Sequence, residues 1–142
     1  MNSSILSSQG SSKSSSKVKE IDKTGLYYAK KGDQVKFRYE VLDELGKGAF
    51  GKVYKAYDHK NKEEVALKVL KSKDVKNEQG LNEVHVLKII KSFGDATQHN
   101  IIEYEDTFIF RNHICMTFEL MDMNLYEVIK GRNFRGLQLK YI

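Results

Sequence analysis

The sequence predicts an α+β fold in which a five-stranded antiparallel sheet carries one helix. Apolar and polar residues alternate in several short segments, as they do in half-buried strands. One helical period, at about residues 79–92, falls between the third and fourth of these segments. Short polar turns join the second segment to the third and the fourth to the fifth, which favours antiparallel pairing.

The first 36 residues are predicted to form a flexible arm. Nine of the first sixteen residues are serine, and no apolar period is sustained up to residue 36. Seven lysines and three acidic residues give the arm a net charge of +4, which is nearly all of the chain's +5. A nucleic-acid-binding domain would carry its basic excess in the folded part, so nucleic acid is excluded as the main partner.

Ordered structure is expected to start at residue 37, where Phe37, Tyr39 and Val41 alternate with polar or charged residues. The second and third strands read as a hairpin around a polar turn at residues 58–62. The second to fifth strands are expected at about 52–57, 65–70, 103–111 and 114–120, and short helical stretches at 125–130 and 137–142.

Composition excludes several other classes of protein. Cys115 is the only cysteine, so the chain forms no internal disulfide and no thiolate zinc cluster. The four histidines are not spaced as a helical metal-ligand pair, and no metal site is expected. No apolar run is long enough to span a membrane, and the N-terminus has no signal core. We therefore expect a cytoplasmic or nuclear location and no membrane partner.

A glycine-rich segment lies between the first two strands and has the pattern G-x-G-x-x-G-x-V. In a dinucleotide-binding fold such a motif opens a helix, whereas here it leads into a β-favouring run. A hairpin of this kind lets backbone N–H groups approach phosphate oxygens closely, because no side chain intervenes. The residues assigned to this hairpin are Leu45, Gly46, Lys47, Gly48, Ala49, Phe50 and Gly51.

Lys68 lies in the middle of an apolar strand, seventeen residues after the last glycine of the hairpin. Side chains in a strand alternate between faces, so Ala66 and Lys68 share one face while Val65, Leu67 and Val69 point into a core. A lysine that reaches to solvent is the alternative interpretation. Together with the hairpin, the lysine indicates a phosphate site.

Glu83 lies on the same helical stripe as Leu87 and Ile90, at the spacing i, i+4 and i+7. An unpaired carboxylate on that face would cost several kcal/mol to bury. We therefore expect Glu83 to pair with Lys68. The alternative is that Glu83 is exposed and that Glu78 takes this place.

These features together resemble the N-terminal lobe (N-lobe) of a eukaryotic protein kinase, with its αC-type helix. Residues 37–42, 56–60, 110–120 and 123–127 are similar to the dual-specificity tyrosine-regulated kinases, the DYRK family of CMGC kinases. The resemblance covers about residues 26–142, so residues 26–36 belong either to the arm or to a family extension. It implies an N-lobe at 37–121, followed at 122–142 by the hinge exit and the start of a C-terminal lobe.

The resemblance implies ATP as the ligand and protein hydroxyls as the phosphate acceptors. Lys68, held by Glu83, would contact the α- and β-phosphates. Val53 and Ala66 would form the apolar ceiling over adenine, and Phe118 the gatekeeper behind it. Backbone groups of the hinge, at Glu119 and Met121, would hydrogen-bond the adenine edge. Without the resemblance, Phe118 reads as an ordinary core residue.

The sequence departs from the family because it contains neither a His-Arg-Asp catalytic loop nor an Asp-Phe-Gly motif. No catalytic residue and no metal ligand is therefore assigned, and Mg²⁺ is expected only in a full-length parent. The chain alone is predicted to be inactive. It is interpreted as a fragment of a kinase or, alternatively, as a short form that acts as a non-catalytic nucleotide- or partner-binding module.

Overall fold

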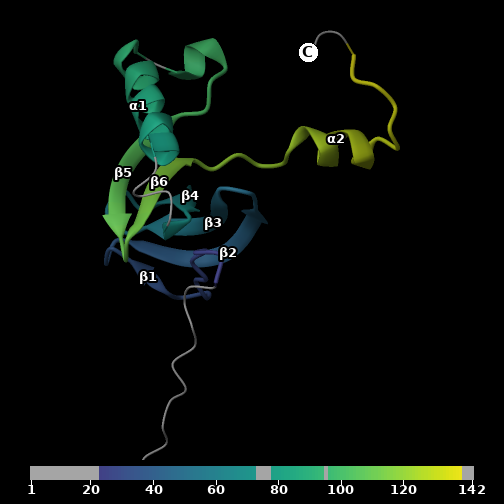
Figure 1. Cartoon of the computed structure of the whole chain (residues 1–142). Helices are drawn as coiled ribbons and strands as arrows, with labels where there is room; N and C mark the ends of the chain where they lie inside the picture. Colours follow the sequence, from purple (N-terminus) through teal and green to yellow (C-terminus); the bar gives the residue numbers. More distant parts are fainter. Residues whose placement is uncertain (1–22, 73–77, 95, 139–142) are drawn as a thin grey trace, which may run out of the picture.

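The computed structural model describes residues 23–72, 78–94 and 96–138. Within them the chain forms one antiparallel sheet with the strand order β1-β2-β3-β4-β6-β5 (Figure 1). The strands are β1 (Gln34–Val35), β2 (Tyr39–Lys47), β3 (Gly51–Asp58), β4 (Glu63–Leu70), β5 (Tyr104–Phe110) and β6 (His113–Glu119). The helices are α1 (Glu78–Ser92), the short 3-10 helix η2 (Ala96–His99) and α2 (Leu125–Gly131). The predicted α+β fold of a kinase N-lobe is confirmed.

The sheet has six strands rather than the predicted five, because the fold begins before residue 37. The additional strand, β1, pairs with β2, and Leu26, Tyr27 and Val35 are buried. Of the two interpretations left open for residues 26–36, a flexible arm does not fit, since these residues are folded onto the sheet. We call residues 24–36 the N-terminal segment. Phe37, expected in the first strand, is 98% exposed and lies in a turn with φ of 54°.

Hydrogen bonds fix the N-terminal segment to the sheet. The buried hydroxyl of Tyr54 on β3 donates to the carbonyl of Tyr27 at 2.8 Å and accepts from the N–H of Ala29 at 3.2 Å. Just after the end of β4, the N–H of Ser72 donates to the carbonyl of Gly25 at 2.9 Å. Because both buried backbone groups beside Tyr28 have partners, this segment is part of the folded lobe.

The two faces of the sheet are covered differently. On one face, which we call the closed face, inward residues of β2 to β6 pack against Tyr27 and Val35 of the N-terminal segment. On the other, which we call the helix face, α1 packs through Val84 and Leu87 onto residues of β4, β5 and β6. The inward residues of the closed face are Tyr39, Val41, Tyr54, Ala56, Val65, Leu67, Val69, Phe108 and Cys115.

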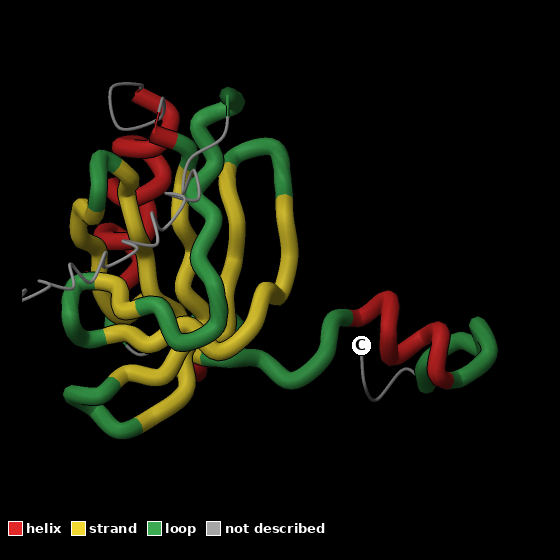
Figure 2. Tube along the Cα trace, turned by 90° about the horizontal axis from the view of Figure 1, so that it is seen from below, coloured by secondary structure: helices red, strands yellow, loops and turns green. Residues whose placement is uncertain are grey.

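The sheet is curled, so that β2 and β5 approach one another although three strands separate them in the sheet order. The rings of Tyr39 and Phe108 stack with centroids 5.3 Å apart and planes 3° from parallel. Arg38 forms two hydrogen bonds with the buried Asp58, at 2.8 and 2.6 Å, and lies 3.6 Å from Asp106 on β5. The curvature is visible from below in Figure 2.

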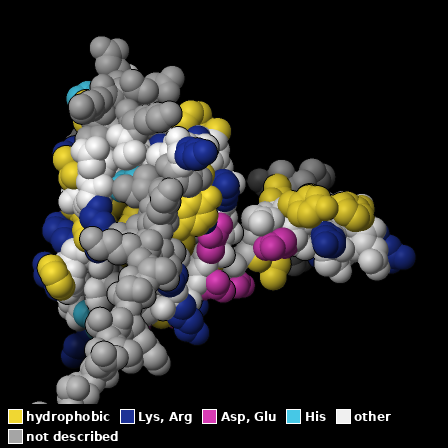
Figure 3. Space-filling view, turned by 60° about the horizontal axis from the view of Figure 1, so that its bottom comes forward, with side chains coloured by type: hydrophobic (Ala, Val, Ile, Leu, Met, Phe, Trp, Pro, Cys, Tyr) yellow, Lys and Arg dark blue, Asp and Glu magenta, His cyan; other side chains and the backbone are white. Residues whose placement is uncertain are grey.

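The helix α2 stands apart from the sheet at the end of an extended segment (Figure 1). Asn124 caps its N-terminus, since its side chain accepts a hydrogen bond from the N–H of Glu127 at 2.9 Å. None of its residues is buried, and Figure 3 shows hydrophobic side chains open on this part of the chain. Residues 137–138 are not helical, and the rest of the helical stretch expected at 137–142 lies outside the described residues.

Among the described helices, none is long and apolar enough to cross a membrane.

Candidate functional site

The glycine-rich segment forms the hairpin between β2 and β3. Gly46 pairs with Val53 and Lys47 with Lys52, and the N–H of Gly48 donates to the carbonyl of Gly51 at 2.9 Å. Ala49 and Phe50 lie at the exposed tip, where Phe50 is 60% exposed. The expected hairpin is therefore present, although its strands extend further into the glycine motif than predicted.

The three glycines of the hairpin have different surroundings. A Cβ at Gly51 would lie 2.2 Å from the carbonyl oxygen of Val69 on β4, so only glycine fits there. At Gly46 and Gly48 a Cβ would meet nothing within 4 Å. None of the three has a positive φ. Packing therefore requires Gly51, a constraint that the sequence analysis did not foresee, while Gly46 and Gly48 leave their backbone bare toward open space.

Lys68 on β4 and Glu83 on α1 form an ion pair through Nζ and Oε1. The predicted pairing is thus confirmed, and the side chain of the alternative residue Glu78 lies outside the described residues. The two side chains are 26% and 36% exposed, so solvent screens their attraction. An ion pair of this exposure contributes at most about 1 kcal/mol to stability. Its consequence is the fixed direction of the ammonium group.

Apolar side chains surround this ion pair on the helix face. Val53 is the cross-strand partner of Lys68, and Ala66 is the partner of Phe118. Directly paired residues project from the same face, so these side chains form two neighbouring rows on the helix face of the sheet. Val53 and Ala66 are half-buried, while Phe118 is buried and packs edge-on against the ring of Tyr104.

The segment expected to be the hinge starts at the end of β6. The N–H of Glu119 donates to the carbonyl of Glu103 at 3.0 Å, and its carboxylate accepts from the N–H of Glu103 at 2.7 Å. Glu119 alternates with Phe118, so its side chain leaves from the closed face rather than from the helix face. Met121 and Leu45, also predicted for the site, are 63% and 51% exposed. More than half of each of these two residues is therefore open to solvent.

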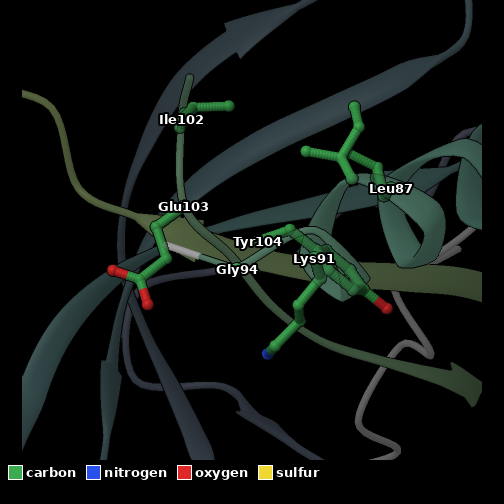
Figure 4. Close-up of a pocket in the computed structure, with 7 residues that line it drawn as sticks. Leu87, Lys91, Gly94, Ile102, Glu103 and Tyr104 are labelled. Carbon is green, nitrogen blue, oxygen red and sulfur yellow. The ribbon is translucent and has the colours of Figure 1, made fainter. Parts of the chain in front are cut away.

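A pocket of about 170 Å³ lies between α1 and the start of β5 (Figure 4). The side chain of Lys91 donates to the carbonyl of Glu105 at 2.7 Å beside it. The pocket contains none of the residues predicted to contact a nucleotide, so it is a separate cavity behind the helix. Its lining residues are Leu87, Ile90, Lys91, Gly94, Ile102, Glu103 and Tyr104.

Lys52 is a charged residue whose burial the sequence analysis missed. Its side chain is 4% exposed, and Nζ lies 2.6 Å from a carboxylate oxygen of Glu44. Burial lowers the pKa of Lys52, but the hydrogen bond that its ammonium donates to Glu44 and the surrounding charges outweigh this effect, so the pKa lies above its usual value. Lys52 therefore stays charged. Its alternation with Tyr54 and Ala56, both inward residues, was the available signal.

An acidic cluster lies around the turn between β3 and β4, where carboxylate oxygens of Asp58, Glu63 and Glu105 are within 4.8 Å of one another. Asp58 already accepts hydrogen bonds from Arg38 and from the N–H of Lys60, and the guanidinium holds the pKa of Asp58 below its usual range. The cluster contains no residue of the predicted nucleotide site. Of the three, Asp58 is engaged in an ion pair within the fold.

Comparison with known proteins gives the family. The protein kinase domain family matches residues 39–140. Over 127 residues, 89% of this chain, the sequence is 42% identical to dual specificity tyrosine-phosphorylation-regulated kinase 4 of Homo sapiens, of which it covers 24%. It is 40% identical to dual specificity tyrosine-phosphorylation-regulated kinase 2 of Drosophila melanogaster, with 85% of this chain and 17% of the relative covered.

A third relative is the serine/threonine-protein kinase ppk5 of Schizosaccharomyces pombe, which is 42% identical over 83% of this chain and 14% of its own length. The chain thus spans between 14% and 24% of the length of these relatives. The antiparallel sheet with its helices is consistent with the N-lobe of this family. The chain belongs to the protein kinase domain family and forms an N-lobe similar to that of the dual-specificity tyrosine-phosphorylation-regulated kinases.

Proposed function

We propose that this chain is the ATP-binding part of a dual-specificity serine/threonine protein kinase, which transfers the γ-phosphate of ATP to hydroxyl groups of protein substrates. The observation that carries the proposal is the ion pair between Lys68 and Glu83. It holds an ammonium group on the same face of the sheet as Val53 and Ala66. An apolar wall beside one fixed cation suits a ligand with a flat base and a phosphate tail.

Nine of the predicted residues have a definite task in this proposal. Lys68 binds the α- and β-phosphates, and Glu83 keeps its ammonium from turning into solvent. The open backbone at Gly46 and Gly48 lets phosphate oxygens approach, since no side chain stands there. Adenine lies against Val53, Ala66 and Phe118. Backbone groups of Glu119 and Met121 form hydrogen bonds with the edge of the adenine ring.

These residues bind and orient ATP but do not transfer a proton. Phosphoryl transfer depends mainly on positioning and on neutralisation of charge, and Mg²⁺ supplies part of that charge when it is bound. In the described part of the chain, the one acidic cluster that could hold a cation includes none of the predicted nucleotide residues. We therefore assign neither a Mg²⁺ ligand nor a catalytic base to this chain. A cytoplasmic or nuclear location stays a prediction from sequence.

Titration of the 142-residue chain with ATP, followed by NMR shifts of Val53 and Ala66, tests the proposal. Lys68→Met should weaken ATP binding about tenfold or more, because a hydrogen bond between charged groups contributes about 1.5–3 kcal/mol. Lys55→Met is the matched control. Lys55 shares this face, but its Nζ pairs with Glu64 at 2.8 Å. Equal ATP affinity in wild type and Lys68→Met would exclude Lys68 from the site.

For the 142 residues by themselves we infer nucleotide binding without catalysis, since neither His-Arg-Asp nor Asp-Phe-Gly occurs in them. Incubation with ATP, Mg²⁺ and a peptide library should give no phosphopeptide. Transfer that disappears in Lys68→Met would contradict this inference and would mean that the chain supplies its own proton acceptor.

A further inference from the structure

Tyr28 of the N-terminal segment contacts the glycine hairpin. The ammonium of Lys52, on β3, lies 3.8 Å from the centroid of the Tyr28 ring. The ammonium of Lys47, on β2, lies 3.4 Å from the Tyr28 hydroxyl and 5.9 Å from the same ring centroid. Lys47 and Lys52 are cross-strand partners next to the hairpin tip. One aromatic side chain thus contacts both strands of the hairpin.

Two like charges on directly opposed residues repel and would open the hairpin. Lys52 is also almost completely buried, so water screens it little. Three groups face the ammonium of Lys52: the carboxylate of Glu44, the ring of Tyr28 and, further away at 5.8 Å from its centroid, the ring of Tyr54. Glu44 and Tyr54 come from β2 and β3, the two strands of the hairpin itself. Tyr28 is the one that comes from outside the hairpin.

The backbone on either side of Tyr28 is held firmly. The carbonyl of Tyr27 and the N–H of Ala29 both hydrogen-bond the hydroxyl of Tyr54. Tyr27 is itself buried, and its ring packs against Phe110 at 5.9 Å and His113 at 5.5 Å. The backbone of Tyr28 is therefore fixed on both sides. Its side chain is half-buried, and the ammonium groups of Lys47 and Lys52 lie over its ring.

We propose that Tyr28 is a positioning residue for the glycine hairpin. Its ring holds Lys52 in place, and through Lys52 it fixes the β3 strand of the hairpin in the position that a nucleotide requires. The part that concerns nucleotide rests on the proposed function, whereas the part that concerns the hairpin stands on the contacts alone. A change in residues 24–36 would then alter ATP affinity from the closed face, without touching the ligand.

Peptide-level hydrogen exchange on the whole chain tests the proposal. Tyr28→Leu keeps an apolar side chain but removes the aromatic face, and should raise exchange in residues 46–52 about tenfold. Tyr28→Phe keeps the ring and should change it less than about twofold. Tyr57→Leu removes a half-buried tyrosine from the other face of β3, where it packs on His59, and should leave residues 46–52 unchanged.

Three outcomes would overturn the proposal. Unchanged exchange of residues 46–52 in Tyr28→Leu would mean that the ring does not hold the hairpin. Equal effects of Leu and Phe would assign the effect to the hydroxyl. A rise of the same size in residues 104–119 would indicate global destabilisation. If exchange rises as expected while ATP affinity stays the same, Tyr28 positions the hairpin, but the proposed role of the hairpin in ATP binding fails.

Discussion

The closed face and the helix face of the same sheet have different exposures and different partners. On the closed face, Tyr39, Val65 and Leu67 are fully buried, and an earlier part of the chain covers them. On the helix face, Lys68 and Glu83 remain partly exposed beside half-buried residues. Burial is what stabilises a fold, while partial exposure leaves room for a ligand. Both faces therefore contribute buried side chains to the core, but only the helix face leaves a charged pair partly open, and that is where we propose that the ligand binds.

The largest effect expected from this comparison is at Tyr27, the anchor of the N-terminal segment. Tyr27→Ala should cost about 3–5 kcal/mol of unfolding free energy, because it removes a large buried aromatic side chain. Phe37→Ala is the control, since Phe37 is 98% exposed and should change stability by less than about 0.5 kcal/mol. Urea unfolding compares them. Equal effects would mean that residues 24–36 do not cover the closed face.

The glycines of the hairpin provide the next largest contrast. Gly51→Ala should cost about 3 kcal/mol, because its Cβ would meet the backbone of Val69 and force β3 away from β4. Gly48→Ala should change the unfolding free energy by less than about 1 kcal/mol, since open space surrounds it. Thermal unfolding of both variants measures these two costs. A Gly51→Ala variant as stable as wild type would show that β4 shifts to make room for the Cβ.

A smaller effect is expected at the rim of the closed face, where Arg38 pairs with Asp58. Arg38→Met should cost about 2 kcal/mol at neutral pH, because the buried Asp58 carboxylate loses its guanidinium partner. The folded-state pKa of Asp58 lies below its usual 3.8, so this stabilisation is complete above that pH. It is lost as the pH falls through the lowered pKa.

The difference in urea midpoint between wild type and Arg38→Met should therefore shrink as the pH falls toward about 2. Lys55→Met, which breaks the exposed pair with Glu64, should show a difference of less than about 0.5 kcal/mol at neutral pH. A pH-independent difference for Arg38→Met would assign its effect to lost packing rather than to the charge of Asp58.

The smallest effect is expected at Glu105, where a substitution should increase the unfolding free energy rather than decrease it. Burial and the neighbouring charges of Glu63 and Asp58 raise the pKa of Glu105 above its usual 4.5. The protein therefore loses stability as the pH rises from the usual value through the raised one. Glu105→Gln should stabilise the chain at pH 7 by less than about 1 kcal/mol. Thermal unfolding at about pH 3 is the control, where both side chains are neutral and the difference should vanish.

Much of the helix face could be predicted from the sequence, because its signals are local. The alternation around Lys68 fixes the side from which it projects, and the helical spacing of Glu83 and Leu87 fixes the face of α1. Given one strand and one helix, a lysine and a glutamate on facing sides have to meet. That reasoning needs no knowledge of distant residues.

The closed face could not be predicted in the same way, because its cover is irregular. Leu26, Tyr27 and Val35 are spaced with neither a strand nor a helical period, so no pattern marks them as buried. The contact of Tyr28 with Lys52 joins two segments that are separated in the sequence by strands β1 and β2. It depends on the path of the N-terminal segment, which only tertiary packing determines.

The stack of Tyr39 on Phe108 bears on how the lobe assembles. The two rings are far apart in the sequence, because strands β3 and β4 and helix α1 lie between them. Contacts that close such long loops are slow to form and slow the folding of sheet proteins. We therefore expect the sheet to curl late in folding. Until then, the rings of Tyr39 and Phe108 do not cover each other, and such exposed apolar groups favour aggregation of incompletely folded chains.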